Sequence, residues 1–512
     1  MPKWTADQEN AIYAKWRNKE KTESANILVN AAAGSGKTAV LVERIINKLC
    51  APEGSPDRCS ADNLLVVTFT NAAAKEMQGR IYSALSKKYA QAAQTDSEEA
   101  EYLKRQLSLI HSADITTIDA FCLKEVRSRF HLLGIDPDFK IADSAECEML
   151  KDDCIEELFE QSYCNEDFCE LLNLFSDGRD DTALANVILN VFNFTRSQPN
   201  PDMWMEEKSE LMLLDEDVNP YFRTVKAEVG EKLCRAAAMY KSAIELMYSA
   251  IYGENRHLSD SDLHSIIAEN PPESDNDFHN SFGIIYKICA NEYSLAKSAS
   301  QASWNEAKSL LESFVFEKIN ASVKNRNRDT EIKDSEILNP IKDKRAAAKK
   351  LLKDTAEYFF ESVSDIQRIT REHIYPMIRT LIKYVKNFEE VYNKKKSEKN
   401  LCEFSDIEHM ALRLFSDFSE VSDELKSKYT EILMDEYQDS NALQEAIFSE
   451  ISRGNNQFTV GDMKQSIYRF RSSDPDIFKS KCDAYTKDET ALNRKIVLSK
   501  NFRSRKEVLD GI

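Results

Sequence analysis

The sequence predicts an α/β fold: a parallel sheet covered by helices, with a large, mainly helical insertion. Three observations support this fold class. Short apolar runs alternate with helical patterns over residues 26–141, the alternation returns over residues 431–502, and the long segment between these regions lacks it. Strands that alternate with helices are typical of a parallel sheet, because each parallel connection needs a crossover that is usually helical.

The first part of the sheet is predicted from three apolar runs, each followed by a helical pattern. The runs are ILVN (27–30), LLVVTF (64–69) and DITTI (114–118), and the helices begin at Lys37, Asn71 and Asp119. Short apolar or β-branched runs suit buried strands, whereas apolar residues three and four positions apart suit helices. We therefore expect residues 1–142 to form the first part of the core domain.

Residues 143–400 are predicted to form the insertion. Their long helical patterns contain four glycines, and the loop-like breaks SQPNPDMW and IIAENPPESDNDFHN indicate more than one lobe. The runs EILMDE, QFTVGD and KIVLSKNF then predict further strands, so that residues 401–498 complete the core domain and residues 499–512 begin a second one. No internal repeat is evident.

The composition indicates a globular chain without a membrane span. Of the 512 residues, 42% are hydrophobic and 30% are charged, and no apolar run reaches the length of about 18 residues that a span needs. The N-terminus lacks the basic-then-apolar pattern of a secretory signal, so we expect a cytoplasmic protein with no membrane partner. Eleven scattered cysteines without a C-x-x-C pair predict free, mostly buried thiols rather than a metal site.

The net charge of −19 does not exclude a nucleic-acid partner. Net charge governs solubility and long-range steering, whereas phosphate binding needs only a local basic cluster. One such candidate, with no acidic residue inside it, lies near the C-terminus. Its members are Arg494, Lys495, Lys500, Arg503, Arg505 and Lys506. The alternative interpretation is a solvated basic helix end.

The stretch VNAAAGSGKT, residues 29–38, indicates a phosphate-binding loop, because it follows an apolar strand and opens an amphipathic helix. Gly34 and Gly36 would allow the tight turn and the approach of a phosphate oxygen to backbone N–H groups. Lys37, expected to be an exposed loop residue that contributes little to packing, would hold the β- and γ-phosphates, and Thr38 would bind Mg²⁺. The candidate nucleotide-binding residues are Ala31, Ala32, Ala33, Gly34, Ser35, Gly36, Lys37 and Thr38. A plain strand-to-helix turn is the alternative.

The stretch EILMDEYQD, residues 431–439, supplies two acidic residues at the end of a second apolar strand. Asp435 would bind the Mg²⁺ ion through its coordination sphere, and Glu436 would act as the general base that polarises the attacking water. An acidic pair at a surface strand end is the alternative, but it does not account for the apolar run and the phosphate-binding loop together.

Near the N-terminus, WTADQENAI allows two interpretations of Gln8. Thr5 and Gln8 have the spacing of a helix capping box, which by itself explains both residues. A glutamine just before the first strand could also bind an adenine edge, because its amide offers a donor and an acceptor.

Seven stretches, in this order along the chain, resemble the motifs of superfamily 1 DNA helicases of the UvrD/Rep type. They are WTADQ, AAAGSGKT, TFTNAAAKEM, TTIDAFC, LMDEYQDS, VGDMKQSIYRFR and LSKNFRS. The sequence is most similar to the AddA-type subunit of the ATP-dependent helicase-nucleases of the AddAB type, notably in IADSAECEMLKDD, FSDIEHMALRLF and VGDMKQSIYRFRSSDPDIF. The resemblance covers both ends of the chain, while the middle is similar mainly in length and helical character.

This resemblance implies a RecA-like P-loop ATPase core that drives a motor from 3′ to 5′ along single-stranded DNA. It implies ATP and Mg²⁺ as cofactors, single-stranded and duplex DNA as partners, a second subunit of the AddB type, and a role in recombinational repair of double-strand breaks. By position, Gln8 would bind adenine, and Gln465 and Arg503 would sense the γ-phosphate beside the base Glu436.

The resemblance also assigns DNA contacts to loops that follow the predicted strands. The candidates are Phe69, Asn71, Thr117, Phe121, Tyr468, Phe470 and Arg471. A motor that ignores base sequence needs aromatic faces, worth about 1–3 kcal/mol per stacked base, and basic groups for phosphates. The stretch SIYRFR offers both, although half-buried arginines at a strand or helix start are the alternative. Asn71 also suits a helix N-cap.

Two features depart from the family pattern. Asp119 stands where many relatives of the UvrD type carry a histidine. The chain ends shortly after the NFRS motif, whereas the family continues through a second RecA-like domain and, in the AddA type, a nuclease domain. We therefore expect residues 1–512 to bind ATP, but to turn over far more slowly than a longer chain and not to unwind duplex DNA. A stand-alone UvrD-type repair helicase without nuclease, and a nucleotide-gated DNA-binding module with an incomplete motor, are the alternatives.

Overall fold

The structure, a computed structural model, describes residues 4–14, 26–55, 57–95, 97–175, 180–252, 259, 277–318, 334–466, 473–489 and 491–502. The chain forms two compact units. The core unit comprises Met1–Met205 together with Leu381–Ile512, and the helical unit comprises Glu206–Thr380. Among the helices of the described residues, none is long and apolar enough to cross a membrane.

The core unit is built on a six-stranded sheet in the order β3-β2-β6-β7-β1-β8, and every neighbouring pair is parallel. The strands are β1 (Asn26–Ala31), β2 (Leu64–Thr68), β3 (Asp114–Thr117), β6 (Glu431–Met434), β7 (Gln457–Gly461) and β8 (Asn493–Leu498). The predicted α/β fold class is thereby confirmed. Strands from the C-terminal part of the chain, β6 and β7, lie between β2 and β1.

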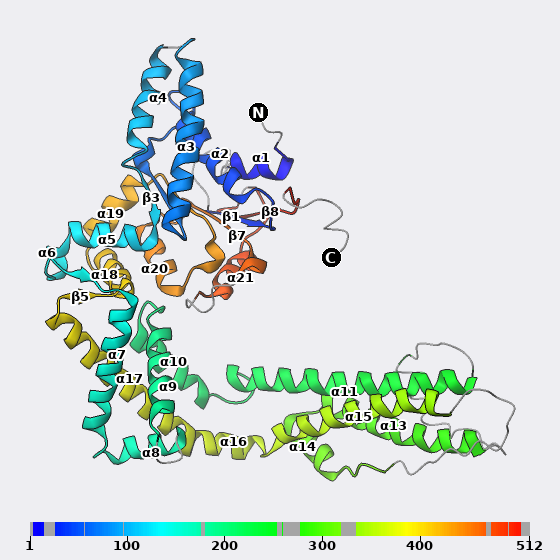
Figure 1. Ribbon diagram of the computed structural model, residues 1–512. Coiled ribbons are helices and arrows are strands. Elements are labelled where there is room, and N and C mark those ends of the chain that lie inside the picture. Colours follow the sequence, from blue (N-terminus) through cyan, green and yellow to red (C-terminus); the bar gives the residue numbers. More distant parts are fainter. Residues whose placement is uncertain are drawn as a thin grey trace. The chain divides into compact units, whose positions relative to one another are not determined.

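Helices cover both faces of this sheet (Figure 1). Successive strand residues point to opposite faces, so Ile27 and Val29 belong to one core and Leu28 belongs to the other. The first core is completed by α1 (Ala6–Ile12), α2 (Lys37–Leu49), α3 (Asn71–Ala92) and α4 (Ser97–Leu109). The second is completed by α5 (Ile118–Ser128), α18 (Phe404–Asp417), α19 (Ser419–Lys428), α20 (Ala442–Ile451) and α21 (Pro475–Ala484).

A short parallel pair joins the two chain segments that flank the predicted insertion. β4 (Lys140–Ile141) pairs with β5 (Leu401–Cys402). The helices between them that belong wholly or partly to the core unit are α7 (Ser144–Ser162), α8 (Glu166–Phe175), α9 (Thr182–Thr195), α10 (Pro201–Glu210) and α17 (Tyr375–Glu398). Shorter helical elements are α6 (Phe130–Leu133), η1 (Ala61–Asn63), η2 (Leu211–Leu213), η3 (Glu357–Phe359), the π-helical η4 (Thr370–Ile374), η5 (Tyr437–Asp439) and η6 (Met463–Gln465).

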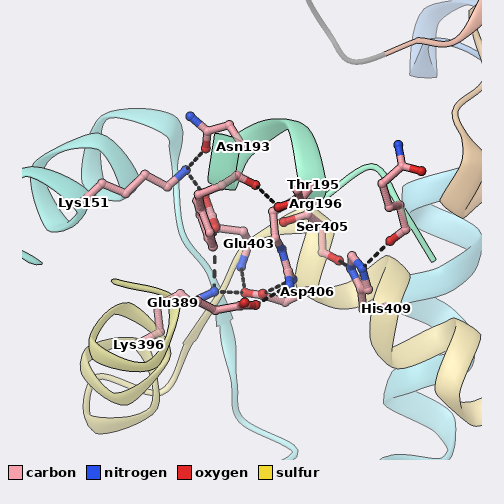
Figure 2. A network of polar contacts seen from close by, with 12 residues as sticks. Lys151, Asn193, Thr195, Arg196, Glu389, Lys396, Glu403, Ser405, Asp406 and His409 are labelled. Carbon is pink, nitrogen blue, oxygen red and sulfur yellow. Dashed lines mark hydrogen bonds and ion pairs between the residues drawn. The ribbon is translucent and has the colours of Figure 1, made fainter. Parts of the chain in front are cut away.

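A polar network holds α7, α9 and α17 against the start of α18 (Figure 2). Asp406 lies 2.8 Å from the guanidinium of Arg196 and 2.6 Å from the ammonium of Lys396, and it accepts the N–H of Glu403 at 2.8 Å. Burial alone would raise the pKa of Asp406, but the two cations outweigh it and lower that pKa. Lys151 reaches Glu403 at 2.9 Å. These bonds fix the position of Arg196 at the end of α9.

The helical unit has a core of its own. Figure 1 shows α11 (Pro220–Tyr252), α13 (Asp277–Gln301) and α15 (Asp334–Ala356) side by side, and α14 (Trp304–Ser313) also contributes to the core. α16 (Val363–Ile369) follows them. Inside the bundle, Nε of Arg345 donates to the buried carboxylate of Glu292 at 2.9 Å. A buried charge is tolerable only when it is paired in this way.

Candidate functional site

The glycine-rich loop lies between the end of β1 and the start of α2. Gly34 and Gly36 have φ angles of 72° and 86°, a left-handed conformation that would cost another residue about 1–2 kcal/mol. The hydroxyl of Ser35 is buried and has no hydrogen-bond partner among the residues described. A loop with this backbone and an unpaired buried hydroxyl is suited to a phosphate group, which offers several acceptor oxygens.

Five predicted site residues from three chain segments come together beside this loop. The ammonium of Lys37 lies 3.3 Å from Oε2 of Glu436 and 3.2 Å from Oε1 of Gln465. The hydroxyl of Thr38 lies 3.5 Å from Oδ2 of Asp435. Lys37 is only 9% exposed. The expectation that it is an exposed loop residue is therefore wrong, because its ammonium points inward to the acidic strand end.

The acidic strand end carries a third carboxyl group, that of Asp439. Burial, with the neighbouring Glu436 as the second cause, raises the pKa of Asp435 and that of Asp439 to about 6 each. Glu436 itself has a φ of 52°, and the only other residue apart from glycine with a positive φ in the described part of the chain is Asn400. Strained backbone of this kind gathers at functional sites, where it aims a side chain.

The donor set fits a Mg²⁺ ion. In the described ranges, no group of three or more His, Cys, Asp or Glu side chains is placed to hold a metal. Mg²⁺ does not need such a cage, because it keeps several waters and is bound by one or two protein oxygens together with substrate phosphates. Thr38 and Asp435 offer two hard oxygen ligands. In addition, Oδ1 of Asp439 is buried without a partner among the described residues, so a hydrated cation would satisfy it.

Gln8 links the N-terminal helix to the glycine-rich loop. Its Oε1 accepts the N–H of Thr5 at 3.0 Å and its N–H donates to the Thr5 hydroxyl at 3.3 Å, so the capping box is present. Its Nε2 donates to the carbonyl of Ser35 at 2.9 Å. In this arrangement both ends of the amide bond to the protein itself, and the adenine contact of Gln8 stays a prediction.

Two adjoining cavities open at the carboxyl ends of β2 and β6. Both are lined by Phe69, Asp435, Glu436 and Asp439. The larger, about 550 Å³, is also lined by Thr38, Lys464 and Gln465. The smaller, about 270 Å³, is also lined by Thr117, Asp119, Arg196 and Glu408. The first continues the nucleotide site, and the second extends it toward the end of α9.

Three of the predicted DNA-contact residues lie near these cavities or on the rim of the sheet. Phe69 is half-buried and Asn71 is exposed. The N-cap of α3 is Thr70, whose hydroxyl accepts the N–H of Ala73 at 3.1 Å, so the expectation that Asn71 is the cap is wrong. Thr117 is buried and caps α5. Asn71 is thus left free of any capping role.

Phe121 lies elsewhere. Its ring is fully buried, with the rings of Phe415 and Tyr429 each 6.2 Å away. This burial argues against the predicted contact of Phe121 with DNA, because a stacking platform has to present its face to solvent. The remaining predicted site residues, Tyr468, Phe470, Arg471 and Arg503, lie outside the described residues.

The candidate basic cluster near the C-terminus is not one surface. Arg494 is 4% exposed, and its guanidinium donates to Asn10 at 2.7 Å and to Glu489 at 3.0 Å. Lys495 donates to the carbonyl of Cys482. Both side chains lie on strand β8 and are used inside the fold, so for these two residues the interpretation as a basic helix end is wrong. Lys500 is exposed, and the other three members are outside the described ranges.

A pair of carboxyl groups in the smaller cavity was not anticipated. Glu408 on α18 is buried and accepts a hydrogen bond from Nε2 of Gln444 at 2.9 Å. Burial, and next the charge of Asp119 nearby, raise the pKa of Glu408 to about 8. The sequence shows that Asp119 departs from the family pattern. Its neighbour Glu408 lies almost 300 residues later in the chain, and a single sequence does not reveal such a contact.

A buried ion pair behind the glycine-rich loop was also missed. The guanidinium of Arg44 on α2 contacts Glu431, the first residue of β6, at 2.6 Å, and both are 4% exposed. Its Nη1 donates to the carbonyls of Ala11, Ile12 and Ala14 at 3.0–3.2 Å, at the end of α1. One side chain therefore ties together the helix of Gln8, the helix of Lys37 and the strand that leads to Asp435.

Comparisons with known proteins agree with this geometry. Residues 13–486 match the model of the UvrD/REP helicase N-terminal domain. The whole chain is 36% identical to the A subunit of the ATP-dependent helicase/nuclease of Clostridium novyi and 36% identical to that of Alkaliphilus oremlandii. It is 35% identical to the protein of the same name from Clostridioides difficile. The chain spans 38–39% of the length of these relatives.

Proposed function

Because this chain belongs to the UvrD/REP helicase family, we propose that it is the motor core of an ATP-dependent DNA helicase that moves 3′ to 5′ along single-stranded DNA. The relatives, each named as part of an ATP-dependent helicase/nuclease, support a more specific role, in a helicase-nuclease of double-strand break repair and recombination. In that role the chain would work in the cytoplasm with a second subunit of the AddB type. Residues 143–400 would be its insertion domain.

The observation that carries this proposal is the meeting of Lys37, Thr38, Asp435, Glu436 and Gln465 at one edge of a parallel sheet. Ligands of open α/β sheets bind at the carboxyl ends of the strands, which is where these side chains lie. An ammonium, a hydroxyl, a metal-binding carboxylate and a candidate base are the groups that phosphoryl transfer from ATP to water requires.

The residues would act in the following way. The loop and Lys37 would bind the β- and γ-phosphates, and Thr38 and Asp435 would hold a Mg²⁺ ion that would supply further positive charge there. A phosphate that binds Lys37 competes with Glu436 for this ammonium group. Glu436 is then free to accept the proton of a water aligned with the γ-phosphorus. Gln465, bonded to Lys37 in the structure, lies close enough to contact the same phosphate.

The DNA path would follow the loops after the strands. Phe69 lines both cavities next to Asp435 and Glu436, so a base or sugar against its ring would lie close to the hydrolytic site. The exposed Asn71 and the predicted contacts at Tyr468, Phe470 and Arg471 would extend the path. This proximity offers a simple route for DNA to stimulate hydrolysis.

The test is DNA-stimulated ATP hydrolysis and strand separation by the full-length protein. We expect oligo(dT) to raise the ATPase rate, and a duplex with a 3′ single-stranded tail to be unwound while one with a 5′ tail is not. Lys37→Met is the matched inactive control. Nucleotide-dependent DNA binding without stimulated hydrolysis would favour the nucleotide-gated module, and unwinding without any nuclease activity would favour a stand-alone helicase.

A further inference from the structure

Gln438 occupies a buried position next to the candidate base, and sequence reasoning assigned it no role. It lies in η5, directly after the Asp435–Glu436 pair, and is 2% exposed. Its Nε2 donates to Oε2 of Glu436 at 2.9 Å and to Oδ2 of Asp439 at 3.0 Å. Its Oε1 accepts the N–H of Asp462 at 2.9 Å. A flipped amide would lose all three bonds, so the surroundings allow one orientation.

These bonds belong to a closed ring of five residues. From Glu436 the ring runs through Gln438 to Asp462, whose carboxylate accepts Nε2 of Gln465 at 2.7 Å. Oε1 of Gln465 accepts the ammonium of Lys37 at 3.2 Å, and Lys37 returns to Glu436 at 3.3 Å. Gln438 is the member that connects the acidic strand end to the segment after β7. A shift of either segment therefore changes the hydrogen bonds of the Glu436 carboxylate.

The end of β7 presses directly on Gln438. A Cβ at Gly461 would lie 2.6 Å from Oε1 of Gln438, 3.1 Å from its backbone nitrogen and 2.8 Å from the ring of Phe478. Real Cβ atoms essentially never lie within 3.0 Å of other atoms, so the contacts with Oε1 of Gln438 and with the Phe478 ring would each require a shift. Gly461 is therefore needed here for close approach, and the approach makes the contact between β7 and Gln438 stiff.

We propose that Gln438 is a positioning residue that couples the Asp462–Ser466 segment to the Glu436 carboxylate, and so makes hydrolysis responsive to DNA. This inference rests on the proposed function. Ser466 donates to the carbonyl of Gln438 at 3.3 Å, which gives the segment a second attachment. The residues that follow Ser466 in the sequence are those predicted to contact DNA. DNA that moves this segment would turn the Gln438 amide and thereby align Glu436 with the attacking water.

The experiment compares wild-type protein with two variants of Gln438 in the full-length chain. Gln438→Met keeps the length of the side chain and removes both its hydrogen-bond donor and its hydrogen-bond acceptor. Gln438→Glu keeps an acceptor for the Asp462 N–H but puts a carboxyl oxygen in place of the NH₂ group that donates to Glu436. Because the side chain keeps its size, a loss of stimulation in this variant would not come from a cavity. For both we expect the ratio of DNA-stimulated to basal kcat to fall about tenfold or more, since misplacement of a catalytic group by about 1 Å can cost 10²-fold. The affinity for an ATP analogue and for single-stranded DNA should stay within about twofold.

The matched control is Gln106→Met. Gln106 is 1% exposed and accepts the backbone N–H of Ala61 at 2.8 Å, far along the chain from the nucleotide site. It should keep the wild-type stimulation ratio, as a merely structural glutamine would. Gly461→Ala should also lower the ratio of DNA-stimulated to basal kcat, because its Cβ would displace the Gln438 amide. Its effect should not add to that of Gln438→Met.

The outcomes separate this inference from the function on which it rests. If wild-type protein is stimulated by DNA and Gln438→Met keeps the same ratio, the coupling role is overturned while the helicase proposal stands. An equal loss of the ratio in Gln106→Met would also overturn it, because the effect would then be general destabilisation. If wild-type protein shows no stimulation at all, the proposed function itself fails and the coupling fails with it.

Discussion

The ammonium of Lys37 and the carboxylate of Glu436 lie 3.3 Å apart, although Lys37 opens the second helix and Glu436 follows the fourth strand of the sheet along the core sequence. Lys37 is 9% exposed and Glu436 is 39% exposed. The pair places a cation beside the three carboxyl groups of the acidic strand end. Lys37 also lowers the pKa of Asp435 against the stronger effects of burial and Glu436. The phosphate-binding and hydrolytic groups therefore share one electrostatic environment.

Lys37→Met should abolish ATP hydrolysis and lower thermal stability. The loss of activity, expected to be at least about 100-fold, follows from the missing charge on the phosphates. The loss of stability follows from the buried carboxyl groups that lose their counter-charge. Without Lys37 the pKa of Asp435 rises further, so the decrease in Tm should be larger at pH 8 than at pH 5. ATPase assays and thermal melts at both pH values test this prediction.

The matched control for this variant is Lys48→Met on the same helix. Lys48 pairs with Glu431 at 3.5 Å, at the opposite end of β6 from the nucleotide site. Its removal should leave hydrolysis in place. Retained DNA-stimulated hydrolysis in Lys37→Met would refute the assignment of the phosphate-binding loop.

Glu436→Gln should bind ATP but fail to hydrolyse it. The amide preserves the shape of the side chain and removes the base, which is worth about 10²–10⁴-fold in rate. It also removes one of the negative charges that raise the pKa of Asp435. Fluorescent-nucleotide titration and single-turnover hydrolysis measure the two effects separately. Loss of binding and hydrolysis together would instead make Glu436 a structural residue.

Glu408→Gln should stabilise the protein more as the pH rises. In the folded state the pKa of Glu408 is raised from 4.5 to about 8, so the folded protein keeps a proton that the unfolded chain releases. The stability that this group contributes is complete below pH 4.5 and is lost progressively as the pH rises to about 8. Glutamine cannot ionise. The difference between the Tm of the variant and the Tm of wild type should therefore increase by several degrees from pH 5 to pH 8.5.

The control for the pH experiment is Glu424→Gln, a glutamate whose side chain is 63% exposed and which pairs with Arg129. Its Tm difference from wild type should be the same at both pH values, because an ion pair with an exposed carboxylate contributes little to stability. A constant difference for Glu408→Gln as well would show that Glu408 is ionised in the folded protein.

Binding of single-stranded DNA should weaken strongly with salt despite the net charge of −19. Each phosphate that meets a lysine or arginine releases counterions, and three such contacts would lower the affinity roughly 20-fold between 50 and 200 mM salt. Fluorescence anisotropy with labelled oligo(dT) at several salt concentrations measures the slope. An affinity that does not change over this range would contradict the DNA path proposed here.

The strands of the sheet could be predicted from the sequence, but their order could not. Each of the six apolar runs became a parallel strand, because a run such as Ile27–Val29 is apolar on both faces of the sheet. Which strand pairs with which depends on contacts between distant segments, such as that of β2 with β6. Periodicity carries no information on such pairs. The short β4–β5 pair, of two residues each, left no signal at all.

The same distinction holds for the site. Lys37, Thr38 and Asp435 follow from local patterns, because the loop, the helix start and the strand end each have a signature of their own. The burial of Phe121 and the bonds of Gln8 depend on what packs against them from elsewhere in the chain. The left-handed backbone of Glu436 has no signature either, since glutamate does not favour it.

The strand order has a consequence for the time course of synthesis. β1 and β2 are synthesised early, but in the sheet they are separated by β6 and β7, which lie within residues 431–461. A ribosome that adds about 5–20 residues per second needs roughly 15 to 60 s to travel from residue 142 to residue 457. During this interval β1 has neither of its neighbours β7 and β8, so its unpaired backbone edges and its apolar faces are open to other chains.

The helical unit does not share this delay, because its contacts join helices that lie within residues 206–380. The helical unit can fold on the nascent chain before the middle strands of the sheet, β6 and β7, have been synthesised. We expect a chaperone that binds extended apolar segments to be captured on ribosome-bound chains that stop between residues 150 and 430, and to be released from chains that extend beyond β8. Because β6 and β7 lie between β1 and β2, we expect the nascent chain to need a chaperone that the folded protein no longer needs.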